Sequence, residues 1–130
     1  MREILFRGQR TDNNNWTKGY LFCIWEKAYI LWGTTNGIPN MIEVIPETVG
    51  QYTGWEDKNG KKIFEGDIIE GGYLNPLTNK FNSKKYVVEF KHATFIGKLI
   101  GHSPYGDTWL YFVHGDIIGN IHDNPKLLER

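Results

Sequence analysis

The sequence predicts a mainly β protein, a small antiparallel β-barrel-like domain with long loops and little helix. Short runs that mix aromatic and β-branched residues recur along the chain, and turn-forming residues separate them. Fifteen glycines are spread through the 130 residues. No window longer than about ten residues keeps a helical period without a glycine or proline inside it.

The first three strands are expected at residues 3–8, 16–25 and 28–33, as an antiparallel meander. Residues 12–15 form a polar turn between the first two strands, and Glu26-Lys27 is a tight turn before the third. Apolar residues occupy both faces of the second segment: Trp16, Tyr20, Phe22 and Ile24 on one, and Leu21, Cys23 and Trp25 on the other. We therefore expect this strand to be covered on both sides.

Polar residues with Gly or Pro predict two long loops, over residues 34–40 and 71–84. Asn59-Gly60 is the strongest hairpin signal, because both residues tolerate positive φ. Further strands are expected at 41–49, 67–70, 85–91, 94–100 and 109–113, with a turn at His92-Ala93 and a helical turn at 124–129.

These elements predict one domain over residues 1–130, with an N-terminal meander (1–45) and a C-terminal barrel-like part (46–130). The strand order of the second part is similar to that of SH3-like barrels, an analogy from pattern alone. The strings at 65–69 and 114–118 share Gly-Asp-Ile-Ile. They are compatible with a duplication or with ordinary turn chemistry before a strand.

The composition of the chain indicates its compartment and limits the classes of partner that it is expected to bind. Cys23 is the only cysteine, the N-terminus does not resemble a signal peptide, and no apolar run approaches about 20 residues, so we expect a cytoplasmic protein. Fifteen basic and fifteen acidic residues balance, which argues against non-specific DNA binding. Locally, residues 80–98 hold five lysines against Glu89, and residues 43–70 hold seven carboxylates against three lysines.

Residues 51–71, QYTGWEDKNGKKIFEGDIIEG, resemble the signature of the YopX family. The opening MREILFRGQR and the ending IIGNIHDNPKLLE are also similar to that family, although Lys126 stands where the ending often has a carboxylate. The resemblance implies a small, largely β protein of phages and prophages of Gram-positive bacteria, without an established activity. It therefore implies no catalytic residues that could be transferred.

The sequence lacks the residue patterns of common metal-binding, nucleophilic and phosphate-binding sites. An EF-hand loop with Gly60 at its sixth position would place Trp55 and Gly66 where ligands are needed. The histidines at 92, 102, 114 and 122 lack a familiar metal-ligand spacing. Cys23 lies in an apolar strand, where a thiol is usually a buried hydrophobic group. Phosphate-binding glycine motifs are absent. We expect no catalytic residue, no cofactor and no metal.

The aromatic residues are the remaining functional signal, at nineteen of 130. Tryptophans beside turn residues are the best candidates for partial exposure. The candidate binding surface comprises Trp16, Trp55, Trp109, Lys84, Lys85, Tyr86 and Lys91.

Three functions stay open from the sequence. The leading prediction is a non-enzymatic binding or oligomerisation module of a phage, with a protein partner or self-association. The second is a nucleic-acid-binding protein that uses Lys80, Lys84, Lys85, Lys91 and Lys98 with Tyr86, Phe90 and Phe95. The third is a small hydrolase with a carboxylate pair such as Asp67 and Asp116.

Overall fold

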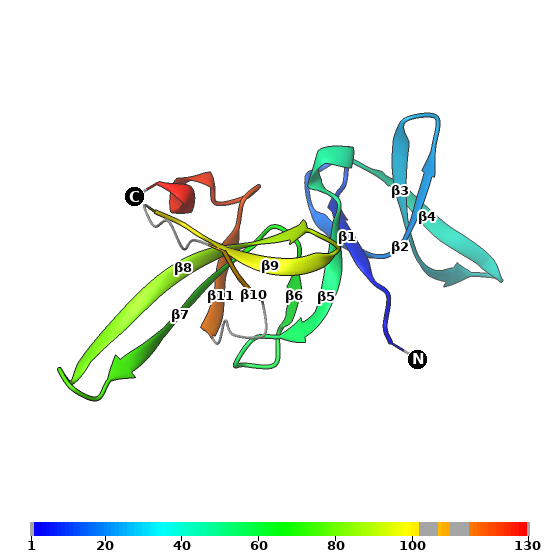
Figure 1. Ribbon diagram of the computed structural model, residues 1–130. Helices are drawn as coiled ribbons and strands as arrows, with labels where there is room; N and C mark the ends of the chain where they lie inside the picture. The colour runs from blue at the N-terminus through cyan, green and yellow to red at the C-terminus, as the bar shows by residue number, and fades with distance from the viewer. Residues whose placement is uncertain (1, 102–106, 110–114, 130) are drawn as a thin grey trace. The chain divides into compact units, whose positions relative to one another are not determined.

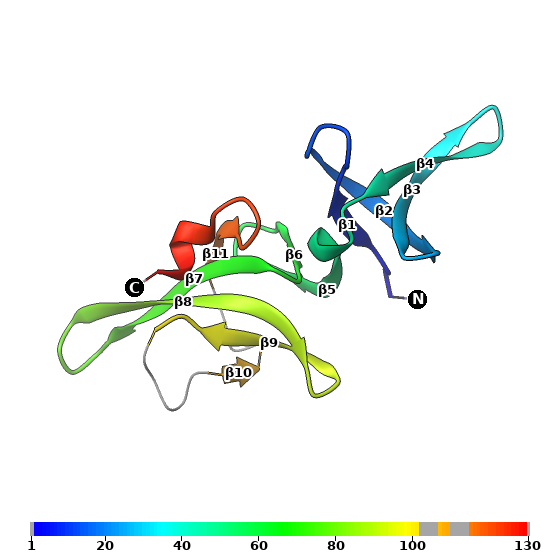
Figure 2. The ribbon, with the colours of Figure 1, turned by 90° about the horizontal axis from the view of Figure 1, so that it is seen from above.

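The computed structural model describes residues 2–101, 107–109 and 115–129, and it confirms the mainly β fold (Figures 1 and 2). The strands form two antiparallel sheets, ordered β4-β3-β2-β1-β5-β6 and β10-β9-β8-β7-β11. Both orders are open, so the strands within the described ranges form no closed barrel. The chain divides into two compact units, Met1–Gly54 and Trp55–Arg130.

The first unit contains the predicted meander. Its elements are β1 (Phe6–Gln9), β2 (Trp16–Ile24), β3 (Lys27–Thr35), β4 (Ile38–Val44), the 3₁₀ turn η1 (Pro46–Thr48) and most of β5 (Gly50–Glu56). Consecutive strands from β1 to β4 pair antiparallel, and β5 pairs with the other edge of β1. The polar turn before β2 lies where the sequence predicts it. The tight turn after β2 is Trp25-Glu26, one residue earlier than the predicted Glu26-Lys27, and Lys27 already begins β3.

The loop predicted over residues 34–40 is wrong, because β3 and β4 continue through it. The turn between them is only Asn36-Gly37, and both residues have positive φ, 54° and 79°. Two-residue hairpin turns require this conformation, and Asn and Gly adopt it most easily. The polar composition of the segment therefore reflects a hairpin tip rather than a long loop.

The sheet of the first unit curls, so that β1 and β4 meet at one end. The N–H of Ile45 donates to the carbonyl of Gln9 at 2.8 Å, and the N–H of Thr11 donates to that of Glu43 at 3.2 Å. Gly8 permits this approach, since a Cβ atom there would meet Val44 side-chain atoms at 3.0 Å. The curl encloses a core of Ala28, Ile30 and Val44, with Phe6, Leu21, Ile42 and Val49 packed against it.

The second unit is built on a meander and one returning strand. Its elements are β6 (Lys62–Phe64), β7 (Asp67–Asn75), β8 (Lys80–Lys91), β9 (Thr94–Leu99), β10 (Asp107–Trp109), β11 (Gly115–Asn120) and the 3₁₀ turn η3 (Pro125–Leu128). The predicted helical turn near the C-terminus is thus present. Residues 110–113 of the predicted strand 109–113 lie outside the described residues.

The loop predicted over residues 71–84 is also wrong. β7 and β8 stay paired in one register from Ile68 opposite Val87 to Asn75 opposite Lys80. They form a long hairpin that extends beyond β9 in Figure 1. Glycines and polar residues in this segment suggested a loop, but backbone pairing between the two strands overrides that local preference.

Both faces of the second sheet hold buried residues. Ile69 and Val88 pack with Ile63 on one face, together with Phe95 and Ile117. Ile68 and Val87 lie opposite each other on the other face, and both are buried. The prediction of a strand covered on both sides therefore describes β7 and β8, not the segment for which the sequence suggested it.

The two Gly-Asp-Ile-Ile strings differ in local structure. Gly66, with φ of 92°, lies in the turn before β7. Gly115 is the first residue of β11 and lies opposite Gly71, where a Cβ atom would come within 2.1 Å of the Glu70 carbonyl oxygen. One glycine serves a turn and the other a close approach of two strands.

Two hairpin turns place residues other than glycine or asparagine at positive φ. Trp25 and Glu26 (48° and 66°) join β2 to β3, and His92 and Ala93 (53° and 61°) join β8 to β9. A non-glycine residue in this region carries a steric cost of about 1–2 kcal/mol, less for Asn. The turns therefore form at some expense of stability.

Replacing His92-Ala93 by Asn-Gly is expected to raise the free energy of unfolding by about 1 kcal/mol, because this pair suits the turn. Urea denaturation measures the change. The reverse change, Gly60→Ala at φ of 81°, should lower stability. A lower stability of the Asn-Gly variant would contradict this assignment of the turn.

Candidate functional site

An apolar surface on the outer side of β2, β3 and β4 is the strongest candidate site. The register places Tyr20 beside Leu31, Phe22 beside Tyr29, and Met41 beside Leu31. Ile24 continues the row along β2. We call this surface the apolar face, and its members are Tyr20, Phe22, Ile24, Tyr29, Leu31 and Met41.

Most of the apolar face is open to solvent within the chain. Tyr20 is 68% exposed, Met41 52% and Phe22 45%, while the two members on β3 are half-buried. The rings of Phe22 and Tyr29 form a cross-strand pair with centroids 6.3 Å apart. The water-facing side of an antiparallel sheet normally carries polar residues. A contiguous apolar row there is the mark of a binding surface.

The strand geometry forces these side chains outward. The alternate residues of the same strands, Leu21, Ile30 and Ile42, point into the core of the first unit. Because neighbouring residues of a strand lie on opposite faces, one layer of sheet cannot bury both sets. Burying the apolar face requires a second layer.

The prediction that segment 16–25 is covered on both sides is therefore wrong within one chain. The prediction of a buried thiol is wrong as well, because Cys23 is exposed. Cys23 pairs with Ala28 near the tip of the β2–β3 hairpin, where three consecutive residues of β2 are exposed. The strand extends past the core that its inner face helps to form.

Charged residues border the apolar face. Lys18 precedes Tyr20 on the same side of β2, Lys27 lies opposite Ile24, and Glu43 lies opposite Tyr29. Lys27 and Glu43 form no salt bridge with any residue that the structure describes. The apolar face of one chain thus has a cation, Lys27, and an anion, Glu43, at its border, and neither forms a salt bridge within the described residues.

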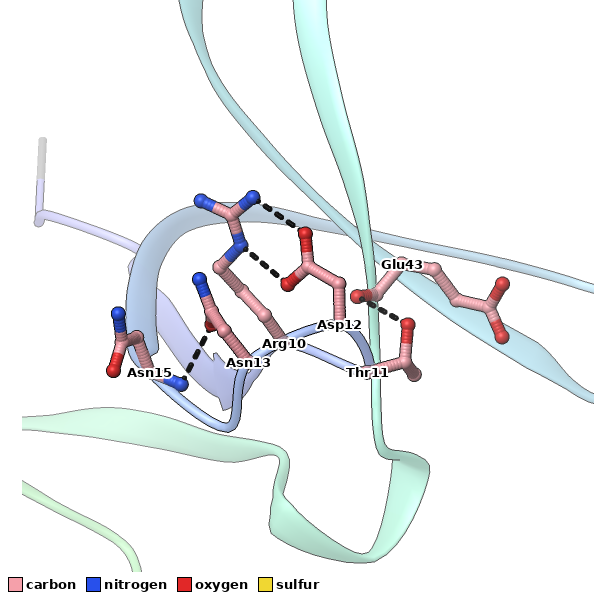
Figure 3. Close-up of polar contacts among 6 residues, drawn as sticks. All are labelled: Arg10, Thr11, Asp12, Asn13, Asn15 and Glu43. Carbon is pink, nitrogen blue, oxygen red and sulfur yellow. Dashed lines mark hydrogen bonds and ion pairs between the residues drawn. The ribbon is translucent and has the colours of Figure 1, made fainter.

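Figure 3 shows the neighbouring turn and why its own charges are already neutralised. The Arg10 guanidinium donates to both carboxylate oxygens of Asp12, at 3.0 and 2.8 Å. This side-chain hydrogen bond raises the pKa of Arg10 and lowers that of Asp12. Glu43 contributes only its backbone carbonyl here, accepting from the Thr11 hydroxyl, and its carboxylate points away from the turn.

The tryptophans predicted for a binding surface have different surroundings. Trp16 is half-buried in the first unit, with the Arg7 guanidinium 4.7 Å from its ring centroid. Trp55 begins the second unit and is 51% exposed. The side chain of Trp109 lies outside the described part of the chain. Their role as a binding surface stays a prediction.

The predicted basic stretch on β8 is divided between two faces. Lys84 and Tyr86 lie on one side of the strand, and Lys85 and Lys91 on the other. Carboxylates interrupt the second side, since Glu70 lies opposite Lys85. The side chain of Lys80 lies outside the described residues.

Phe90 and Phe95, which the sequence groups with these lysines, form an edge-to-face pair 5.1 Å apart. Lys98 lies opposite Val87, on the side of Lys85. The nucleic-acid hypothesis stays a prediction.

The two carboxylates proposed for a hydrolase stabilise turns. Asp67 is 2% exposed and accepts the N–H of Phe64 at 2.7 Å. Asp116 forms an ion pair with Lys58 at 3.1 Å and accepts a hydrogen bond from the Asn59 amide. A carboxylate as buried as Asp67 cannot reach a substrate, so the hypothesis loses its main support.

Asp57 links the signature hairpin 57–60 to β11. One of its carboxylate oxygens accepts the N–H groups of Asn59 and Lys61, both at 2.9 Å, and the other accepts that of Ile117 at 3.2 Å. The N–H of Lys58 also donates to the Gly115 carbonyl. These bonds give the Asp-Lys-Asn-Gly segment a structural task.

A metal site requires three or four ligand side chains close together. No three His, Cys, Asp or Glu side chains among the described residues gather in this way. His102 and His114 of the four histidines lie outside that part of the chain. No helix in the described ranges is long and apolar enough to span a membrane.

Comparison with known proteins gives a family and agrees with the fold. A family model described as YopX protein matches residues 5–129. The crystal structure of protein EF1440 from Enterococcus faecalis is similar over 99% of this chain and 100% of that chain, with 21% identity and a TM-score of 0.55. That likeness shows the fold. No curated protein matches the chain.

Sequence reasoning missed the whole apolar face, because none of its six members is among the predicted site residues. The signal was present as apolar residues on both faces of the segment 16–25. It was interpreted as burial from both sides, although an exposed face produces the same pattern.

Asp57→Ala is expected to lower the free energy of unfolding by about 3 kcal/mol, because three backbone N–H groups lose their acceptor. Asp57→Asn should cost less, since an amide oxygen can still accept from Asn59 and Lys61. Urea denaturation measures both. Asp12→Asn, in an exposed turn, is the control and should leave the midpoint nearly unchanged. Equal effects at the two positions would contradict the link to β11.

The acid stability of the protein should depend on Asp57. Burial raises the pKa of this carboxyl, but the N–H groups of Lys61, Ile117 and Asn59 outweigh burial and hold the pKa below its ordinary value of 3.8. Its contribution is complete above the unfolded-state pKa and is lost as the pH falls through the folded-state pKa. Urea midpoints of wild type and Asp57→Asn should therefore converge between about pH 5 and pH 2. A constant gap would contradict this.

Proposed function

Because the chain belongs to the YopX family, we propose that it is a phage or prophage accessory protein, a non-enzymatic binding module in the cytoplasm of its bacterial host. The apolar face carries this proposal. Its six apolar side chains lie on one side of three paired strands, and four of them are exposed. An exposed apolar surface of this kind is stabilised when a partner covers it.

The composition of the apolar face favours a protein partner. Aliphatic Ile24, Leu31 and Met41 accompany the aromatic rings, and charges stand only at the border. An apolar centre with a polar rim is the usual anatomy of a protein interface. Nucleic-acid binding would need a basic excess to neutralise phosphates, and the chain has equal numbers of basic and acidic residues.

Phe22→Lys tests this function. The tagged wild type should retain partner protein from phage-infected or prophage-induced cells, and Phe22→Lys should lose it, because a charge at the centre of an apolar interface is not solvated. Quantitative mass spectrometry of the retained proteins measures this. Leu77→Lys, at a turn residue that is 93% exposed, is the matched control.

Circular dichroism should show that Phe22→Lys is still folded, since the ring is exposed. Partner retention equal in wild type and Phe22→Lys would overturn the proposal. Retention lost in both variants would also overturn it, because the loss would not depend on the apolar face.

A further inference from the structure

We propose that the partner of the apolar face is a second copy of this chain, bound face to face across a two-fold axis. This inference rests on the proposed function, since it names the occupant of the same surface. It follows from two properties of the face, its area and its self-complementary charges, and from the balanced charge of the whole chain.

The exposed area is close to what a dimer needs. Taking roughly 200 Å² for a whole aromatic side chain, Tyr20 and Phe22 leave about 230 Å² open to solvent. Ile24, Met41 and the half-buried residues on β3 bring the apolar area to roughly 400–500 Å², within the range of about 300–600 Å² for the largest patch on a monomer, which is often functional. With the border residues, the surface approaches the roughly 800 Å² per partner of a standard interface.

The border charges fit a symmetric pair. In a two-fold contact, residue i of one copy meets residue j of the other, and the reverse holds at the same time. Lys27 and Glu43 have opposite charges, lie one strand apart on the same side of the sheet, and form no salt bridge within the described residues. A second copy therefore provides both missing partners at once.

One symmetric arrangement allows the opposite charges of two copies to pair while their apolar side chains are also in contact. In an idealised sheet, strands lie about 4.8 Å apart and residues rise about 3.3 Å. Consider a two-fold axis that lies in the plane of the interface, passes midway between Lys27 and Glu43, and is perpendicular to the line that joins them. This axis places Lys27 of each copy over Glu43 of the other copy. The same axis sets Met41 close to Ile24 of the second copy, and Phe22 close to its own equivalent. The strands then cross nearer to the orthogonal than to the aligned mode of sheet packing.

The overall charge also permits self-association. With fifteen basic and fifteen acidic residues, the net charge is zero, so two copies experience no net repulsion at neutral pH. A different partner would have to match both a cation and an anion at fixed places on the face. The chain itself already meets that requirement.

Sedimentation velocity on the full chain tests the proposal between about 1 and 100 µM, where modest interfaces associate. We expect a concentration-dependent dimer for the wild type. Phe22→Lys should weaken it at least about a hundredfold, because it places a charge at the centre of the interface. Leu77→Lys and Lys98→Glu, which change exposed residues of the second unit, should dimerise like the wild type.

Charge reversal tests the two-fold pairing itself. Lys27→Glu alone and Glu43→Lys alone should each weaken self-association at least about tenfold, because like charges then face each other in both pairs. An equimolar mixture of the two variants should form a heterodimer, because every pair is then opposite in sign. The double variant should self-associate again for the same reason.

Three results would overturn the inference: a wild type that stays monomeric at about 100 µM, a dimer that Phe22→Lys leaves intact, or single charge variants that do not associate when mixed. A monomer whose capture of another protein still depends on Phe22 would overturn the second-copy inference alone. The proposed function would survive that result, so the two failures are distinguishable.

Discussion

Side chains alternate strictly across a β-strand, and the first unit has only one layer of sheet in which to use that alternation. The curl that joins β4 to β1 through the Gln9–Ile45 hydrogen bond encloses one face and leaves the other outside. Val44 and Ile30 become fully buried as a result. Phe22 and Tyr20, on the opposite side of the paired strands, remain in water. The binding surface is thus a direct consequence of how the core is built.

A different interaction organises the family signature. Asp57 gathers three backbone N–H groups from the hairpin and from β11, residues about sixty positions apart in the chain. Asp67 does the same on a smaller scale for the turn before β7. The most recognisable residues of the sequence therefore maintain the second unit. The surface proposed for function lies in the first unit, in a segment without a distinctive motif.

Much of the fold could be predicted from local chemistry, and the failures have a common cause. The meander, the turn at His92-Ala93 and the helical turn at the C-terminus follow from residue preferences within a few positions. The loops predicted at 34–40 and 71–84 fail because strand pairing overrides a Gly- and Asn-rich composition. The exposure of Cys23 could not be predicted, because an apolar pattern does not state which face a core covers. The prediction selected tryptophans beside turns as the exposed aromatic residues and did not include Tyr20 and Phe22.

Side-chain footprinting tests the central claim most directly, because it detects the covering of individual residues in the intact protein. Carbene labelling of the wild type should be compared at about 1 µM and at about 100 µM, the range in which modest interfaces form. The account predicts that labelling of Tyr20, Phe22 and Met41 falls as the concentration rises, while labelling of Trp55 and Leu77 does not change. Undiminished labelling of Tyr20, Phe22 and Met41 at the higher concentration would contradict it.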